Sequence, residues 1–168
     1  MAGGIETLAV HGMLTATYMH YRPPGGNLKN FQGKQMNHTT MSTMQSAARR
    51  LFIPAAIFNW SVAAGLLLLS DVMGPLLRLD PASGTNLALR DMSMLLVALF
   101  GFAYWRIAFD PQRFRPYIEL GILGKSLVLV AIYGHWLAGH IGWQLPAVAF
   151  GDAVFSLLFL QFLRRYPA

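Results

Sequence analysis

The sequence predicts an all-α integral membrane protein, a four-helix bundle behind a disordered amino-terminal extension. Three observations lead to this fold class: a low charge content, four long apolar runs, and basic residues placed beside those runs. Of the 168 residues, 55% are hydrophobic and only 12% are charged, whereas a soluble domain carries about 25% charged residues. Because so few charges cannot cover a soluble surface, we expect much of the surface to face lipid.

Residues 1–50 form the first predicted domain, a disordered or interfacial extension. They are rich in Gly, Pro, Ser, Thr, Asn and Met, with one acidic residue and no sustained apolar period, which indicates disorder. The run from Ile5 to Tyr21 is mildly apolar and allows a short interfacial helix. Met36, Met41 and Met44 lie just before the first long apolar run. Native translation beginning at one of them is an alternative of equal weight, which would leave the preceding residues outside the native protein.

Residues 51–168 form the second predicted domain, a bundle of four transmembrane helices. A helix that crosses the hydrocarbon core needs about 20 mostly apolar residues, and four stretches meet this requirement. They run from Leu51 to Leu69, from about Leu87 to Trp105, from about Tyr117 to Leu137, and from Pro146 to Leu163. Four successive helices that are apolar on nearly every face are not expected in a soluble fold.

The connection between the first two spans is unusually apolar. Between Asp71 and Asn86 it contains Val72, Met73 and three leucines. This composition predicts a short amphipathic segment that lies in the membrane interface. A structural lid is the favoured role for it, and a gate for a substrate is the alternative.

The basic residues predict the orientation, because Lys and Arg in short loops collect on the cytoplasmic side. The amino-terminal flank, the second connection and the carboxyl terminus share one side and carry ten basic residues, whereas the other side carries only Arg78 and Arg90. We therefore expect both termini in the cytoplasm, and a bacterial inner (plasma) membrane as the location. Contact with anionic lipid also accounts for the net charge of +6, so the lipid bilayer is the expected partner and nucleic acid is not.

Composition also excludes several kinds of redox and metal chemistry. The chain has no cysteine, which excludes disulfides, thiol relays and Cys-ligated zinc or iron–sulfur sites. His135 and His140 are five residues apart near the end of the third span, and this spacing predicts that they point to different helix faces. Neither a phosphate-binding glycine loop nor a nucleophile–base motif occurs. The sequence predicts no metal, no cofactor and no catalytic residue, and it favours a protein that is not an enzyme.

Three polar residues lie well inside the predicted spans: Asn59, Lys125 and Asp152. At the rise of an α-helix, Asn59 and Lys125 each lie about 12 Å from the cytoplasmic ends of their spans, and Asp152 about 16 Å. An isolated charge at this depth costs at least about 2.5–3.5 kcal/mol. We therefore predict that Lys125 and Asp152 form an intramembrane ion pair and that Asn59 forms a hydrogen bond with one of them.

Two roles for this polar layer stay open from the sequence. Lys125 and Asp152 can fix the register of the helices, a structural role proposed for some buried ion pairs. Alternatively, Lys125, Asp152 and Asn59 can form a binding or proton-handling site, the default interpretation of ionisable groups inside a membrane. Tyr133 is a further candidate for the lining of such a pocket.

The layout from Leu51 onward resembles that of small bacterial four-span membrane proteins of the DoxX-like kind. The resemblance is carried by GILGK at 121–125, GDAVFSLLFLQFLRR at 151–165 and FNW at 58–60. Since most members of this group are uncharacterised, the resemblance implies a fold more than an activity. Relatives of DoxX include subunits of membrane oxidoreductases. For a chain without a redox ligand of its own, this implies at most an accessory subunit.

Three functions follow in order of preference. The first is an accessory or scaffold subunit that has a structural Lys125–Asp152 pair and a membrane protein partner or a second copy of itself. The second is a carrier or sensor for a small amphiphile or a proton, centred on Lys125, Asp152 and Asn59. The third, with the least support, is an enzyme acting on a lipid-soluble substrate.

Overall fold

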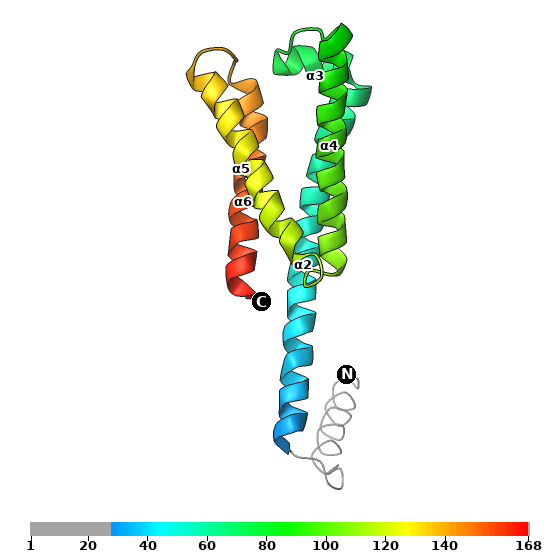
Figure 1. Ribbon diagram of the computed structural model, residues 1–168, viewed down its shortest axis with the longest axis vertical. Coiled ribbons are helices and arrows are strands. Elements are labelled where there is room, and N and C mark those ends of the chain that lie inside the picture. Colours follow the sequence, from blue (N-terminus) through cyan, green and yellow to red (C-terminus); the bar gives the residue numbers. More distant parts are fainter. Residues whose placement is uncertain (1–27, 168) are drawn as a thin grey trace, which may run out of the picture. The chain divides into compact units, whose positions relative to one another are not determined.

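The computed structural model describes residues 28–167, which are almost entirely helical and contain no strand. The helices are α2 (Leu28–Leu68), α3 (Ser70–Leu77), α4 (Gly84–Phe109), α5 (Arg115–Leu137) and α6 (Gln144–Arg165) (Figure 1). The chain divides into two compact units, residues 1–41 and 42–168, and the second unit holds the bundle. The predicted interfacial run from Ile5 to Tyr21 lies outside the described residues.

Four of these helices are long and apolar enough to cross a membrane. The candidate spans are Thr40–Leu68, Gly84–Phe109, Arg115–Leu137 and Gln144–Arg165. Each contains one of the four apolar runs of the sequence, apart from a residue at the end of the first. The predicted all-α fold with four spans is confirmed, and the chain is a multi-pass membrane protein.

The first span begins earlier than the sequence indicated. Residues 42–50 belong to α2, and Ala48 is fully buried. The Gln45 amide donates hydrogen bonds to the carbonyls of Ala108 and Phe109, at 3.1 and 2.6 Å. The second compact unit therefore includes residues 42–50, which lie before the predicted domain boundary. The polar residues of this segment interrupt its apolar run, but they lie on one helical face and leave the other free to pack.

The spans of the second unit associate as two neighbouring pairs (Figure 1). Helix α2 lies beside α4, where the indole nitrogen of Trp60 donates to the carbonyl of Ala98 at 3.1 Å. Helix α5 lies beside α6, and the hydroxyl of Tyr133 donates to the carbonyl of Pro146 at 3.3 Å. The two pairs approach each other near the start of α5 and lie further apart towards α3 (Figure 1).

An aromatic core fills the bundle where the helix pairs meet. Phe52 of α2, Tyr104 of α4 and Phe159 of α6 are at most 1% exposed. The ring centre of Phe159 lies 4.7 Å from that of Phe52 and 5.0 Å from that of Tyr104, within the range of favourable aromatic pairs. Ile118 of α5 is fully buried in the same cluster. Each of the four spans therefore contributes a fully or almost fully buried side chain to one core.

The connection after the first span contains a helix, as its apolar composition indicated. Helix α3 is followed by Arg78, which has a φ of 54° and ends the helix in the left-handed conformation. Val72 and Leu76 are largely exposed, whereas Leu77 is buried. Exposed apolar side chains on a short helix at the end of a span suit a membrane interface, and this placement stays a prediction.

Candidate binding site in the bundle interior

The three polar residues of the interior converge from three different spans. Lys125 of α5 forms an ion pair with the Oδ1 atom of Asp152 of α6. Its ammonium also donates to the side-chain oxygen of Asn59 of α2, at 3.2 Å. The side chains of Lys125 and Asp152 are 6% and 18% exposed. The predicted ion pair and its hydrogen bond to Asn59 are confirmed.

Asn59 extends this network to the remaining span. While its oxygen accepts from Lys125, its amide nitrogen donates to the backbone carbonyl of Val97 of α4 at 3.2 Å. A buried polar group is costly unless it is hydrogen-bonded, and Asn59 satisfies both ends of its amide. One connected network therefore joins all four spans.

Aromatic rings surround the lysine ammonium. Its nitrogen lies 5.3 Å from the ring centre of Tyr104, and 5.8 Å from those of Phe58 and Phe155. A cation within about 6 Å of an aromatic ring is attracted by the ring quadrupole. Such contacts help to stabilise a charge that is buried away from water. The aromatic rings therefore stabilise the Lys125 ammonium in addition to the carboxylate of Asp152.

Two glycines allow the helices to approach closely around this network. A Cβ atom added at Gly121 would lie 2.8 Å from the ring of Tyr104, and one at Gly151 would lie 2.7 Å from the ring of Phe58. Both distances are too short for a real contact, so a side chain at either position would require the facing ring to shift. Small residues at helix contacts are typical of packing in membranes, and here they bring the aromatic rings towards Lys125.

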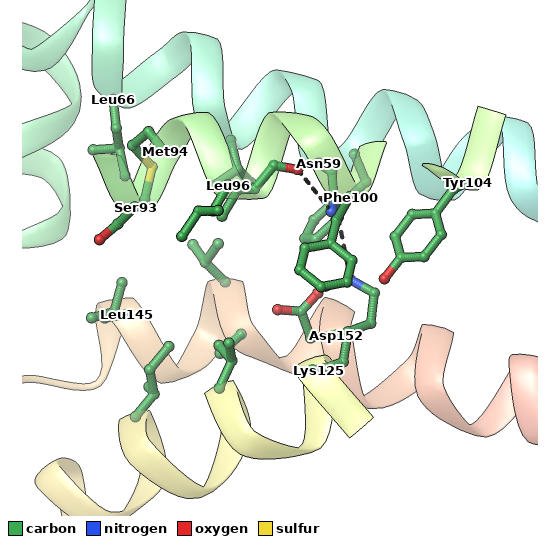
Figure 2. Close-up of a pocket in the computed structure, with 18 residues that line it drawn as sticks. Asn59, Leu66, Ser93, Met94, Leu96, Phe100, Tyr104, Lys125, Leu145 and Asp152 are labelled. Atoms are coloured by element: carbon green, nitrogen blue, oxygen red, sulfur yellow. Dashed lines mark hydrogen bonds and ion pairs between the residues drawn. The ribbon is translucent and has the colours of Figure 1, made fainter. Parts of the chain in front are cut away.

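A cavity of about 420 Å³ opens beside the polar network. Its walls come from all four spans, and its lining includes Asn59, Lys125 and Asp152 (Figure 2). On α4 the lining extends from Tyr104 to Ser93, eleven residues that correspond to about 16 Å along the helix axis. Apart from the polar network and Ser93, the walls are almost entirely apolar. An elongated apolar space with polar groups near one end has the form of a site for an amphiphile.

Two polar groups of this cavity have no partner among the described residues. One is the second carboxylate oxygen of Asp152, since only its Oδ1 atom forms an ion pair or hydrogen bond. The other is the hydroxyl of Tyr104, which points towards Lys125 in Figure 2. A carboxylate oxygen accepts hydrogen bonds, and a tyrosine hydroxyl both donates and accepts them. The site can therefore bind a ligand group that has a hydrogen to donate.

Tyr104 is a residue of the cavity that was not predicted from the sequence. Its neighbour Trp105 was predicted to end the span, which placed both residues at the interface, where aromatic residues collect. In the structure α4 continues to Phe109, so Tyr104 lies more than a turn from the helix end. The available signal was the apolar sequence from Ile107 to Phe109, which lengthens the span.

Tyr133, the fourth candidate for the site, lies outside the interior cavity. Its hydroxyl is engaged with the carbonyl of Pro146, and the side chain is not part of the cavity wall. The predicted trio of Asn59, Lys125 and Asp152 thus comes together, whereas the structure does not bring the fourth candidate to them.

The histidines near the end of α5 differ from their prediction. The Nδ1 atoms of His135 and His140 lie 3.2 Å apart, so the two rings do not point away from each other. Helix α5 ends at Leu137, and Gly139, with a φ of 77°, turns the chain back. Among the described residues, no group of three or more His, Asp or Glu side chains is placed to hold a metal ion.

Comparison of the chain with protein-family models, curated proteins and solved structures gives no match. The chemical interpretation of the site therefore rests on its own residues and geometry.

Proposed function

We propose that this multi-pass membrane protein binds a small amphiphile in the interior of its bundle, as a carrier or a sensor. The observation that carries the proposal is the cavity of about 420 Å³ beside Lys125 and Asp152. Its size falls in the range of small-molecule sites, which are mostly apolar with a few polar groups that orient the ligand.

The polar groups indicate the kind of headgroup. Lys125 and Asp152 neutralise each other, so the site has no net charge to attract an ion. The unpaired oxygen of Asp152 is an acceptor, and the hydroxyl of Tyr104 lies on the same cavity. We therefore infer a neutral headgroup that donates a hydrogen bond, such as an alcohol, on an apolar chain or ring system.

Decanol and decyl methyl ether test this inference, because the ether has the same chain but no hydrogen to donate. We expect decanol to raise the melting temperature of the protein in phosphatidylcholine nanodiscs more than the ether does. Tyr104→Phe should weaken decanol binding about fivefold, as expected for the loss of a hydrogen bond worth about 1 kcal/mol. Equal effects of the alcohol and the ether would contradict the proposed headgroup.

A second pair of variants tests the location. Val148→Trp introduces a bulky side chain into the cavity from α6, and it should abolish binding. Leu157→Trp introduces the same side chain on the same helix, at a position that is 69% exposed, and should leave binding unchanged. If decanol binds both variants equally well, it does not occupy this cavity.

A scaffold or accessory subunit is the second candidate, and the network through Asn59, Lys125 and Asp152 favours it because it joins all four spans. In that role, Lys125→Met and Asp152→Asn would lower the yield of folded protein, while the folded fraction would bind decanol as the parent does. A site for an amphiphile predicts instead that the folded fraction of Asp152→Asn no longer binds decanol. The resemblance to DoxX-like proteins supports this second candidate function. A scaffold or accessory subunit would bind a membrane protein partner or a second copy of itself, and co-purification with such a partner would support this role.

We also propose that both termini face the cytoplasm of a bacterium, on the strength of ten basic residues against two. The chain has no cysteine, so single introduced thiols can report the orientation. A thiol from Ser83→Cys should react with an impermeant maleimide in intact cells, whereas one from Pro167→Cys should react only after lysis. The opposite pattern would reverse the orientation.

A further inference from the structure

A second cavity, of about 360 Å³, lies between α4 and α5 at the end of the bundle where these helices are connected. The wall on α4 runs from Leu99 to Arg106, and the remaining wall consists of Phe114, Tyr117 and Leu120. Phe100 is the one residue that it shares with the interior cavity. We call this second cavity the α4–α5 groove.

Two arginines lie at one aromatic ring of the groove. The guanidinium carbons of Arg106 and Arg113 lie 4.9 and 5.6 Å from the ring centre of Phe114. Neither arginine forms an ion pair in the described part of the chain. The nearby carboxylate of Asp110 instead accepts a hydrogen bond from the backbone nitrogen of Arg113, at 3.1 Å. Two cationic groups that have no carboxylate partner within residues 28–167 therefore lie beside one aromatic ring of an apolar groove.

The position of the groove near the ends of two spans predicts that it lies at the depth of lipid headgroups. Arg106 is three residues from the end of α4, and Tyr117 is the third residue of α5, so both are close to the ends of their spans. Tyr117 is 48% exposed, and its hydroxyl has no hydrogen-bond partner in residues 28–167. Arg, Lys and Tyr side chains at this level are suited to contact lipid phosphates and carbonyls.

We propose that the α4–α5 groove binds one phospholipid with an anionic headgroup. Its phosphate lies against the guanidinium groups of Arg106 and Arg113, and an acyl chain lies along the apolar wall formed by Leu99 and Leu120. Guanidinium groups match phosphate oxygens in both charge and geometry. The proposal does not depend on the function of the interior cavity, because the polar network lies outside this groove.

Lipid binding to the purified full chain in detergent tests the proposal by native mass spectrometry and by the melting temperature. Phosphatidylglycerol and phosphatidylcholine with the same acyl chains serve as probes, and inorganic phosphate serves as the probe without a chain. We expect phosphatidylglycerol to bind in a ratio of one to one and in preference to phosphatidylcholine. Inorganic phosphate should leave the melting temperature unchanged.

Charge variants test the headgroup contact. Each guanidinium near a membrane surface adds about 1 kcal/mol, or about fivefold in affinity. Arg106→Gln and Arg113→Gln should each lower the preference for phosphatidylglycerol about fivefold. Arg164→Gln removes the same charge from an exposed position at the carboxyl end of α6, and it should keep the preference. Should Arg106→Gln prove unstable, Arg113→Gln in the exposed connection tests the same contact.

A variant of the apolar wall tests the contact with the acyl chain. Leu99→Trp fills the groove at a position that is 60% exposed, and it should weaken binding of both lipids. Equal binding of the two lipids by the parent would show an ordinary lipid shell and overturn the proposal. Stabilisation by inorganic phosphate alone would show a site for a free anion, and a dimer that excludes lipid would show a contact between copies. Either result would also overturn it.

Discussion

At the end of the bundle where α4 meets α5, Phe52, Tyr104 and Phe159 fill the interior among α2, α4 and α6. Towards α3, by contrast, Leu66, Ser93 and other side chains line a cavity (Figure 2). The two regions are built from the same four spans and are both largely apolar. What differs is the volume of the side chains and the separation of the helix pairs, so apolar composition alone does not produce a filled core.

The polar network lies at the boundary between the closed and the hollow region. Tyr104 belongs to the aromatic core and also lines the cavity. Lys125 is covered by rings, whereas Asp152 keeps one oxygen available beside the cavity. At this boundary, the aromatic core can stabilise the ion pair on one side, while a ligand in the cavity can contact it from the other side.

The largest expected effect comes from breaking the pair at this boundary. Lys125→Met leaves the carboxylate of Asp152 without its partner, and the loss of one member of a buried pair costs about 3–5 kcal/mol. Asp152 is 18% exposed, so we expect about 3 kcal/mol in the free energy of unfolding, measured by equilibrium denaturation in micelles. The double variant with Asp152→Asn should recover most of the loss. If the single and double variants are equally unstable, the ion pair is not the cause.

Truncations in the two regions test whether one is filled and the other hollow. Phe159→Ala removes a fully buried ring and should cost about 3 kcal/mol, near the lower end for buried Phe because lipid also solvates apolar groups. Val148→Ala removes two methyl groups beside an existing cavity and should cost less than about 1 kcal/mol. The same denaturation assay measures both, and equal losses would contradict the contrast.

The smallest effects come from adding one methyl group to α5. Gly121→Ala places a Cβ atom against Tyr104 and should destabilise the protein by about 1–2 kcal/mol through overpacking. Gly134→Ala is the control on the same helix, since nothing lies within 4 Å of its added Cβ atom. The control should be neutral or stabilising by up to about 1 kcal/mol, because Ala is the better helix former. A stabilising Gly121→Ala would show that the contact with Tyr104 is loose.

Much of the fold could be predicted because the bilayer sets the length of a spanning helix. The apolar runs within α4, α5 and α6 identify these spans, and hydropathy needs no knowledge of their neighbours. The first boundary was missed because residues 42–50 are polar on one face. Their apolar positions Met44, Ala47, Ala48 and Leu51 nevertheless follow the 3, 4 and 7 spacing of one helical face.

The depth of the site residues in the membrane could be predicted from the sequence, but the direction in which their side chains point could not. Counting residues along straight helices placed Asn59, Lys125 and Asp152 in one layer, and the cost of isolated charges predicted that they pair. The same count cannot tell which way a side chain points around the bundle. Neither the presence of Tyr104 in the cavity wall nor the absence of Tyr133 from it could therefore be predicted.

The sequence by itself determined the number of spans and the polar layer between them, because both follow from the local cost of placing each residue in hydrocarbon. Only the tertiary structure decided that a cavity of about 420 Å³ lies beside the ion pair. It also placed two arginines that form no ion pair within residues 28–167 at an aromatic ring of the α4–α5 groove. A cavity depends on the distances between helices and on the side chains that several of them contribute at one level. No single segment of the chain contains that information.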